Sequence, residues 1–199
     1  TWAGPALGED FGVDGTPDDI MEACFDDLLQ GQGEGAGWRL PADSRSRRAP
    51  NSIANKSGLT RDEGQININK ATLWGGNLAI LAALVGTPWL PQVRGGVLFI
   101  EDVHEHPFRI ERMLTQLLYS GVLARQKAIV FGQFTHYKLA PHDKGFKLAT
   151  VVQWLRSQLK IPVLTGLPFG HVPTKVLLPV GATVSLNTDG ADALLFWGN

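Results

Sequence analysis

The chain has 199 residues, with 18 Lys and Arg against 19 Asp and Glu, which gives a formal net charge of −1. This balance argues against a broad basic surface for nucleic acid, and no apolar run approaches the roughly 20 residues that a membrane-spanning helix needs. Hydrophobic residues make up 44% of the chain, enough for a real core, which argues against wholesale disorder. The single cysteine, Cys24, cannot form an internal disulfide, which suits a reducing compartment.

The chain begins with Thr1, and its first residues contain neither an initiator methionine nor a signal peptide. We expect it to be a processed or truncated piece of a longer protein. Its length permits one large domain or two small ones.

A helix is predicted from residue 16 onward, after a Gly- and Pro-rich opening. Thr16 can cap this helix, and Pro17 suits its first turn. Met21, Cys24 and Leu28 then fall on one face at helical spacing. We expect Cys24 to be a small buried hydrophobe rather than a reactive thiol, because no neighbouring Lys, Arg or His would stabilise a thiolate.

Residues 31–70 have the composition of a connection between domains. Glycine alternates with small or polar residues at the start, and a basic cluster at 45–48 lies in polar, Gly-containing sequence. A basic cluster this short is more typical of a solvated linker than of a nucleic-acid site. Short strands are predicted around 38–40 and 65–68.

Strands and helices alternate after residue 72. The apolar run VLFI at 97–100 is typical of a strand buried on both faces. The remaining pattern predicts a helix over 108–118, a strand at 128–131, a helix over 146–159 and a strand at 161–164. This order indicates parallel strands joined by right-handed crossovers. The C-terminal segments 175–178, 183–186 and 193–197 are predicted to be antiparallel strands, so we expect an α/β domain with a β-rich edge.

Chemistry is expected at the carboxyl ends of the parallel strands, where open α/β sheets bind their ligands. Polar or Gly-rich segments occupy three such positions, at 101–106, 132–136 and 165–171. Glu101 directly follows the first buried strand, and His171 lies on a Gly-rich loop. Because parallel topology brings these loops to one edge of the sheet, Glu101 is positioned to orient His171 as a general base.

A metal site at 101–106 is an alternative, because five of these six residues are ionisable and His and carboxylates are metal ligands. The spacing matches no strong zinc signature. The interpretation that we favour treats most of these residues as loop and helix-cap groups, with Glu105 near the N-terminus of the following helix.

The segment LWGGNL at 73–78 is a further candidate for a binding site. Its adjacent glycines, Gly75 and Gly76, suggest a close approach of the backbone, with Trp74 and Asn77 as walls of a substrate site. A tight turn under a packed tryptophan explains the same pattern equally well.

A nucleophile is missing from this constellation. All seven serines lack the Gly-x-Ser-x-Gly context of a nucleophile elbow; they are Ser44, Ser46, Ser52, Ser57, Ser120, Ser157 and Ser185. The sequence therefore supplies a base and its orienting carboxylate without an evident attacking group.

Three motifs together carry a family resemblance. They are LWGGNL at 73–78, LFIED at 98–102 followed by HPFRIERML at 106–114, and LTGLPFGH at 164–171. In this order they resemble the LD-carboxypeptidases, or muramoyltetrapeptide carboxypeptidases, which are serine peptidases of bacterial peptidoglycan recycling. The resemblance runs from about Trp74 to Leu186, and the opening from Gly4 to Gly12 also resembles the stretch that follows the family's nucleophile elbow.

The resemblance implies the C-terminal portion of such a protein. Family members have an N-terminal flavodoxin-like domain that bears the serine, and a C-terminal α/β domain of the swivelling β/β/α type with parallel core strands and antiparallel C-terminal strands. Residues 1–30 would be a remnant of the first domain, 31–70 the linker and 71–199 the C-terminal domain. The matching motifs place the Glu of the Ser-Glu-His triad at Glu101, its His at His171 and its Ser upstream of Thr1.

The implied reaction releases the terminal D-alanine of a murein tetrapeptide, at its bond to meso-diaminopimelate or L-lysine. Substrate contacts are expected from Trp74, Gly75, Gly76, Asn77 and Gly170, with no metal and no organic cofactor. We expect a cytoplasmic homodimer that binds neither nucleic acid nor membrane. The chain alone is expected to be inactive, and the alternative is a non-catalytic module that binds murein peptides.

Overall fold

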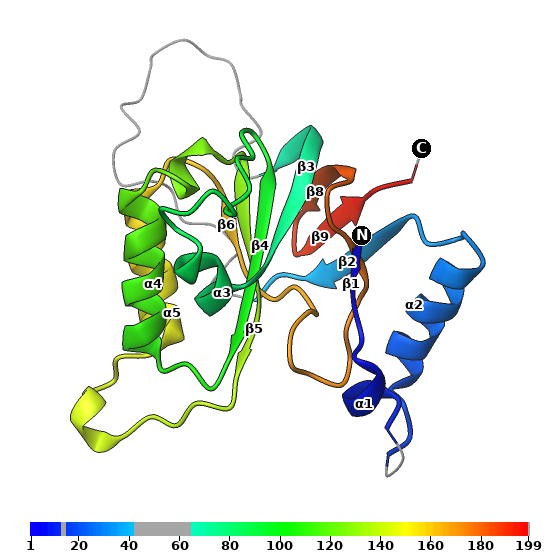
Figure 1. Cartoon of the computed structure of the whole chain (residues 1–199), viewed down its shortest axis with the longest axis horizontal. Coiled ribbons are helices and arrows are strands. Elements are labelled where there is room, and N and C mark those ends of the chain that lie inside the picture. Colours follow the sequence, from blue (N-terminus) through cyan, green and yellow to red (C-terminus); the bar gives the residue numbers. More distant parts are fainter. Residues whose placement is uncertain (13–14, 42–64, 199) are drawn as a thin grey trace.

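A mixed seven-stranded sheet organises the chain (Figure 1). The computed structural model describes residues 1–12, 15–41 and 65–198, and all structural statements refer to these ranges. The strand order is β2-β9-β8-β3-β4-β5-β6. The parallel half consists of β3 (Asn67–Asn77), β4 (Val97–Val103), β5 (Ala128–Thr135) and β6 (Val163–Leu164).

The other half of the sheet is antiparallel. It continues from β3 through β8 (Thr183–Asp189) and β9 (Asp192–Phe196) to β2 (Gly35–Arg39). This arrangement confirms the predicted α/β class, with parallel core strands and antiparallel C-terminal strands. The basic cluster at 45–48 lies outside the described residues, whereas β2 falls within the interval 31–70 that was predicted to be a linker.

Three helices cover one face of the parallel strands, on the left of Figure 1. They are α3 (Leu78–Ala83), α4 (Pro107–Tyr119) and α5 (Leu148–Gln158). In β4, Leu98 and Ile100 pack in the cluster that contains these helices, while Val97 and Phe99 pack in a second cluster with residues of β2, β8 and β9. The strand is therefore buried on both faces, which explains why its apolar residues run without interruption.

The strand β4 is longer than its apolar run predicts. It continues through Glu101 and Asp102 to Val103, and the two acidic residues are 5% and 3% exposed. The expectation that Glu101 follows the strand is corrected: this carboxylate lies inside the sheet, opposite Asn77 of β3. Hydrogen bonds from neighbouring elements compensate for its burial.

The segment 73–78 is also a strand end rather than a loop. Trp74 lies in the core, 4% exposed, and its Nε1 donates a hydrogen bond to Gln126 Oε1 at 3.0 Å. Gly75 packs against the backbone of β4, where a Cβ atom would lie 1.8 Å from the carbonyl oxygen of Phe99. Asn77 ends the strand and caps α3. The close approach predicted for these glycines is therefore made by Gly75, to a neighbouring strand, whereas no atom lies within 4 Å of the Cβ position of Gly76.

The N-terminal segment packs beside the sheet, on the right of Figure 1. It holds β1 (Trp2–Ala3), α1 (Leu7–Asp10) and α2 (Asp19–Leu29). β1 pairs with β7 (Leu178–Pro179) in a separate two-stranded sheet, so the strand predicted at 175–178 does not join β8. Asp18, not Thr16, is the N-cap of α2, because its carboxylate accepts hydrogen bonds from the N–H groups of Ile20 and Met21.

Cys24 of α2 is half-buried and packs against the second core cluster. Burial, together with the nearby negative charges of Asp27 and Asp18, raises the pKa of the Cys24 thiol. A raised pKa disfavours the thiolate, in keeping with the interpretation of Cys24 as a packing residue. No helix within the described ranges combines the length and the apolar character that a membrane crossing demands.

Candidate active site

Glu101 and His171 form a hydrogen-bonded pair at the carboxyl end of the parallel strands. The distance from His171 Nδ1 to Glu101 Oε2 is 3.0 Å. The Glu101 side chain is 6% exposed, whereas that of His171 is 41% exposed. A buried carboxylate therefore holds one nitrogen of an imidazole that solvent and ligands can reach, which is the arrangement of an oriented general base.

Gly170 makes room for this pair. Its φ is +130°, and a Cβ atom there would lie 3.2 Å from both Cβ and Oε2 of Glu101 and 3.0 Å from the carbonyl oxygen of Gln133. Only glycine combines this backbone conformation with so close a contact. Gly170 thus lets the loop cross directly over the carboxylate and present His171 to it.

Asn77 holds the other oxygen of Glu101. Its Nδ2 donates to Glu101 Oε1 at 3.3 Å and to Asp102 Oδ1 at 3.0 Å, while its Oδ1 accepts from the N–H of Ile80 at 3.1 Å. Asp102 is fixed in turn by the N–H groups of Ala79 and Val103. These bonds fix the orientation of the Glu101 carboxylate, and the part of Asn77 as a wall of a substrate site stays a prediction.

The loop that carries His171 is anchored to β5. The backbone N–H of Gln133 donates to the carbonyl of Phe169 at 2.8 Å, and its side-chain amide donates to the carbonyl of Leu167 at 2.9 Å. The hydroxyl of Thr135 donates to the carbonyl of His171 at 3.3 Å. These bonds tie the third predicted segment, 165–171, to the second, 132–136, as the parallel topology predicts.

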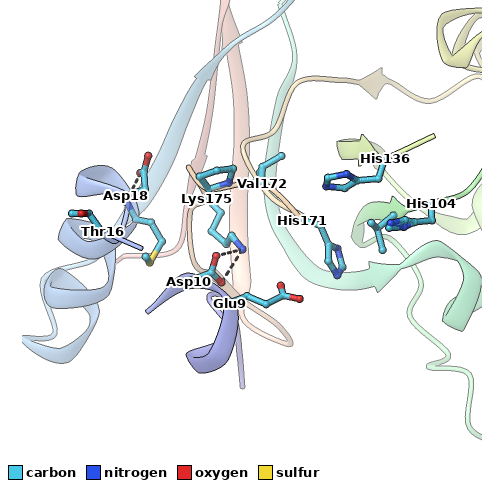
Figure 2. Close-up of a pocket in the computed structure, with 12 residues that line it drawn as sticks. Glu9, Asp10, Thr16, Asp18, His104, His136, His171, Val172 and Lys175 are labelled. Carbon is cyan, nitrogen blue, oxygen red and sulfur yellow. Dashed lines mark hydrogen bonds and ion pairs between the residues drawn. The ribbon is translucent and has the colours of Figure 1, made fainter. Parts of the chain in front are cut away.

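A cavity of about 590 Å³ adjoins His171 (Figure 2). The N-terminal segment supplies one wall, with Glu9, Asp10, Thr16, Asp18 and Met21. The strand ends and the loop of His171 supply the other wall, with Val103, His104, His136, His171, Val172, Pro173 and Lys175. Trp74, Gly75 and Gly76 do not line it. The Trp74 side chain is packed in the core, so the part of Trp74 in a substrate site stays a prediction that this cavity does not support.

Two histidines of the cavity were not singled out from the sequence. His104 directly follows β4 and His136 directly follows β5, and both have left-handed backbones, with φ of +62° and +59°. This conformation costs a residue that is not glycine about 1–2 kcal/mol. Their ring centroids lie 5.2 Å apart. The rule that ligands bind at strand ends could have found both, since each lies in a segment that the rule identifies.

The remaining residues of 101–106 have separate partners. Glu105 forms an ion pair with Arg109, and His106 caps α4 while its Nε2 lies 3.2 Å from Asp143 Oδ2. Among the residues that the structure describes, no group of three or more His, Cys, Asp or Glu side chains could hold a metal ion. Within the same ranges no serine lines the cavity; Ser44, Ser46, Ser52 and Ser57 lie outside them.

An ion pair between Lys175 and Asp10 joins the two walls (Figure 2). Lys175 Nζ lies 2.7 Å from Asp10 Oδ1 and 2.8 Å from Oδ2, and both side chains are buried.

We expect Lys175→Met to lower the free energy of unfolding by about 3 kcal/mol, because it leaves the buried carboxylate of Asp10 without its ion-pair partner. Urea denaturation measures this, and Asp10→Asn combined with Lys175→Met should recover most of the loss. A cost of less than about 1 kcal/mol for the single variant would mean that the pair behaves as a solvated one.

Asp18, on the N-terminal wall, is also tied to the loop after His171. Its Oδ2 accepts a hydrogen bond from Thr174 Oγ1 at 2.6 Å. This bond, with those from the N–H groups of Met21 and Ile20, lowers the pKa of Asp18 from its ordinary value of 3.8. Asp18 therefore contributes stability that is present above this value and is lost as the pH falls through the lower, folded-state value.

The pH dependence can be isolated with Asp18→Asn, which keeps a capping oxygen and cannot titrate. We expect the difference in free energy of unfolding between wild type and Asp18→Asn to stay constant above about pH 5 and to shrink below pH 3.8. Denaturant titrations at a series of pH values measure it. A difference that grows on acidification would contradict the assignment.

Comparisons with known proteins match the part of the chain that contains Glu101 and His171. A family model described as the LD-carboxypeptidase C-terminal domain matches residues 70–186. The solved muramoyltetrapeptide carboxypeptidase from Oxalobacter formigenes is 38% identical, with a TM-score of 0.82 over 100% of this chain and 61% of its own length.

Two curated relatives match over a shorter range. A Synechocystis sp. protein with a provisional carboxypeptidase name is 39% identical over 134 residues, which are 66% of this chain and 44% of the relative. The protein named Probable murein peptide carboxypeptidase in Bacillus subtilis is 34% identical over 123 residues, 62% of this chain and 39% of its own length. The matched part of the chain thus spans less than half the length of either curated relative.

Proposed function

The chain belongs to the LD-carboxypeptidase family, and from this premise we propose that it supplies the general base and its orienting carboxylate to a serine peptidase that acts on murein tetrapeptides. The observation that carries the proposal is the 3.0 Å contact between His171 and the buried Glu101, at the edge of a cavity that can admit a peptide. The name of the Bacillus subtilis relative and that of the solved Oxalobacter formigenes structure support a murein peptide as substrate.

His171 would act at two points of the reaction. Its nitrogen that faces away from Glu101 takes the proton of the attacking serine, and later gives that proton to the amine of the leaving D-alanine. Glu101 accepts the N–H of Nδ1, so it fixes the ring and stabilises the imidazolium that forms between the two steps. Asn77 prevents the carboxylate from rotating away.

The serine is proposed to come from an N-terminal domain encoded ahead of Thr1. Residues 1–30 would then be the end of that domain, 31–70 the connection and 71–199 the C-terminal domain. On this proposal the chain by itself does not turn over substrate. From the family resemblance we also propose that the protein is a cytoplasmic homodimer that works in peptidoglycan recycling.

The test is an assay of D-alanine release from murein tetrapeptide. We expect no release by the chain alone, and release when the chain is expressed together with the segment encoded ahead of Thr1. Absence of release from the longer protein, with the peptide shown to bind, would favour the second candidate, a non-catalytic module that binds murein peptides. That candidate draws its support from the lack of a serine at the cavity within the described residues.

A further inference from the structure

The wall of the cavity beside His171 contains two imidazoles that the proposed mechanism does not use. His104 and His136 are exposed, lie at the ends of neighbouring parallel strands and line the same cavity as His171. In Figure 2 all three histidines lie on one side of the cavity, opposite the N-terminal segment. The backbone of His104 is held there by a hydrogen bond from its N–H to the carbonyl of Thr135 at 2.9 Å.

Most other polar groups of the cavity are already engaged; Glu9 and Thr16 belong to the opposite, N-terminal wall. Lys175 is paired with Asp10, Asp18 accepts from Thr174 and caps α2, and His171 Nδ1 is bonded to Glu101. Within the described part of the chain, the rings of His104 and His136 contact each other and form no hydrogen bond or ion pair. Apart from the His171 nitrogen that the proposed mechanism uses, they are therefore the side-chain N–H donors on this wall that remain free for a ligand among the described residues, and imidazole donates in either protonation state.

The proposed reaction determines which ligand group comes to this wall. A base that protonates the leaving amine must lie within hydrogen-bond reach of that nitrogen. In a peptide cut one residue from its end, the carbon of the terminal carboxylate is two bonds from the same nitrogen. Whenever His171 contacts the scissile bond, the terminal carboxylate therefore lies in the same cavity and needs donors there.

We propose that His104 and His136 bind the terminal carboxylate of the peptide ligand. The inference rests on the proposed function and adds the feature that would make the site select a chain end over an internal peptide bond. The left-handed backbones of the two residues fit this role, since strained conformations concentrate at ligand sites.

The test compares murein tetrapeptide with the same peptide ending in D-alaninamide, which differs only in the terminal charge. By isothermal titration calorimetry on the chain, we expect the free acid to bind about tenfold more tightly than the amide, the range of a charge-assisted hydrogen bond. The double variant His104→Asn/His136→Asn should lose this preference, and asparagine tolerates the left-handed backbone. His142→Asn is the matched control, because His142 is 83% exposed and does not line the cavity.

A second measurement needs no variant. In NMR spectra of the wild-type chain, the imidazole signals of His104 and His136 should shift on addition of the free acid and not of the amide. Equal binding of acid and amide, or a preference that survives in the double variant, would overturn the inference while leaving D-alanine release as the separate test of the function. Acid-selective binding without D-alanine release from the longer protein would support the subsite and contradict the peptidase.

Discussion

Glu101→Gln is expected to lower the turnover number for D-alanine release by about 10³–10⁴-fold, in the protein that includes the serine-bearing segment. Glutamine has nearly the shape of glutamate, so the strand and the hydrogen bond from Asn77 can be retained. It cannot stabilise the imidazolium, and its amide can select the wrong tautomer of His171. Steady-state kinetics with murein tetrapeptide measure the effect.

The matched control is Glu22→Gln, which makes the same chemical change on the exposed side of α2. This variant should keep wild-type turnover. Circular dichroism and thermal unfolding of Glu101→Gln should show that the fold is retained. Wild-type turnover in Glu101→Gln would show that the pair with His171 is structural.

Gly75→Ala should have the largest effect on stability, with a loss of about 4–5 kcal/mol in the free energy of unfolding. The φ of Gly75 is +142°, and a Cβ atom would lie 1.8 Å from the carbonyl oxygen of Phe99 on the adjacent strand. Relief of this overlap requires β3 and β4 to separate, and their contact also positions Asn77 opposite Glu101. Urea denaturation of the chain measures the loss.

Gly76→Ala separates the two causes of this loss. Gly76 has nearly the same φ, +139°, but no atom lies within 4 Å of its Cβ position. We expect Gly76→Ala to carry only the conformational cost of an alanine at this positive φ, about 1–3 kcal/mol. Equal losses in the two variants would contradict the claim that strand contact determines the requirement for Gly75.

The proximity of Glu101 and His171 could be predicted from the sequence, because it follows from the parallel order of the strands that precede them. The apolar run at 97–100 identifies a strand buried on both faces, and parallel neighbours end at the same edge of the sheet. The structure places the two side chains in contact at 3.0 Å. Their catalytic role stays a prediction.

The extension of β4 through Glu101 and Asp102 could not be predicted in the same way. Two acidic residues end a hydrophobic pattern, and what permits their burial is a set of hydrogen bonds from Asn77 and Ala79, more than 20 residues earlier in the chain. Periodicity carries no information about such partners.

The N-terminal wall of the cavity could not be predicted from the sequence either. β1 and β7 have two residues each, too few for a pattern, and the pair of Asp10 with Lys175 joins positions 165 residues apart. The sequence also does not reveal that Trp74 is a core residue. A tryptophan beside glycines suits a ligand wall as well as packing, and the two are distinguished only in the fold, where Trp74 is buried and its Nε1 donates a hydrogen bond to Gln126.

The most direct test of the account is D-alanine release from murein tetrapeptide by the longer protein with His171→Ala. Wild-type protein should release D-alanine, and turnover of the variant should fall by about 10³-fold or more, because among the imidazoles that line the described cavity only that of His171 is hydrogen-bonded to a carboxylate. His142→Ala, a change of an exposed histidine outside the cavity, should behave as wild type. Turnover in His171→Ala equal to that of the wild type would contradict the assignment of His171 as the general base.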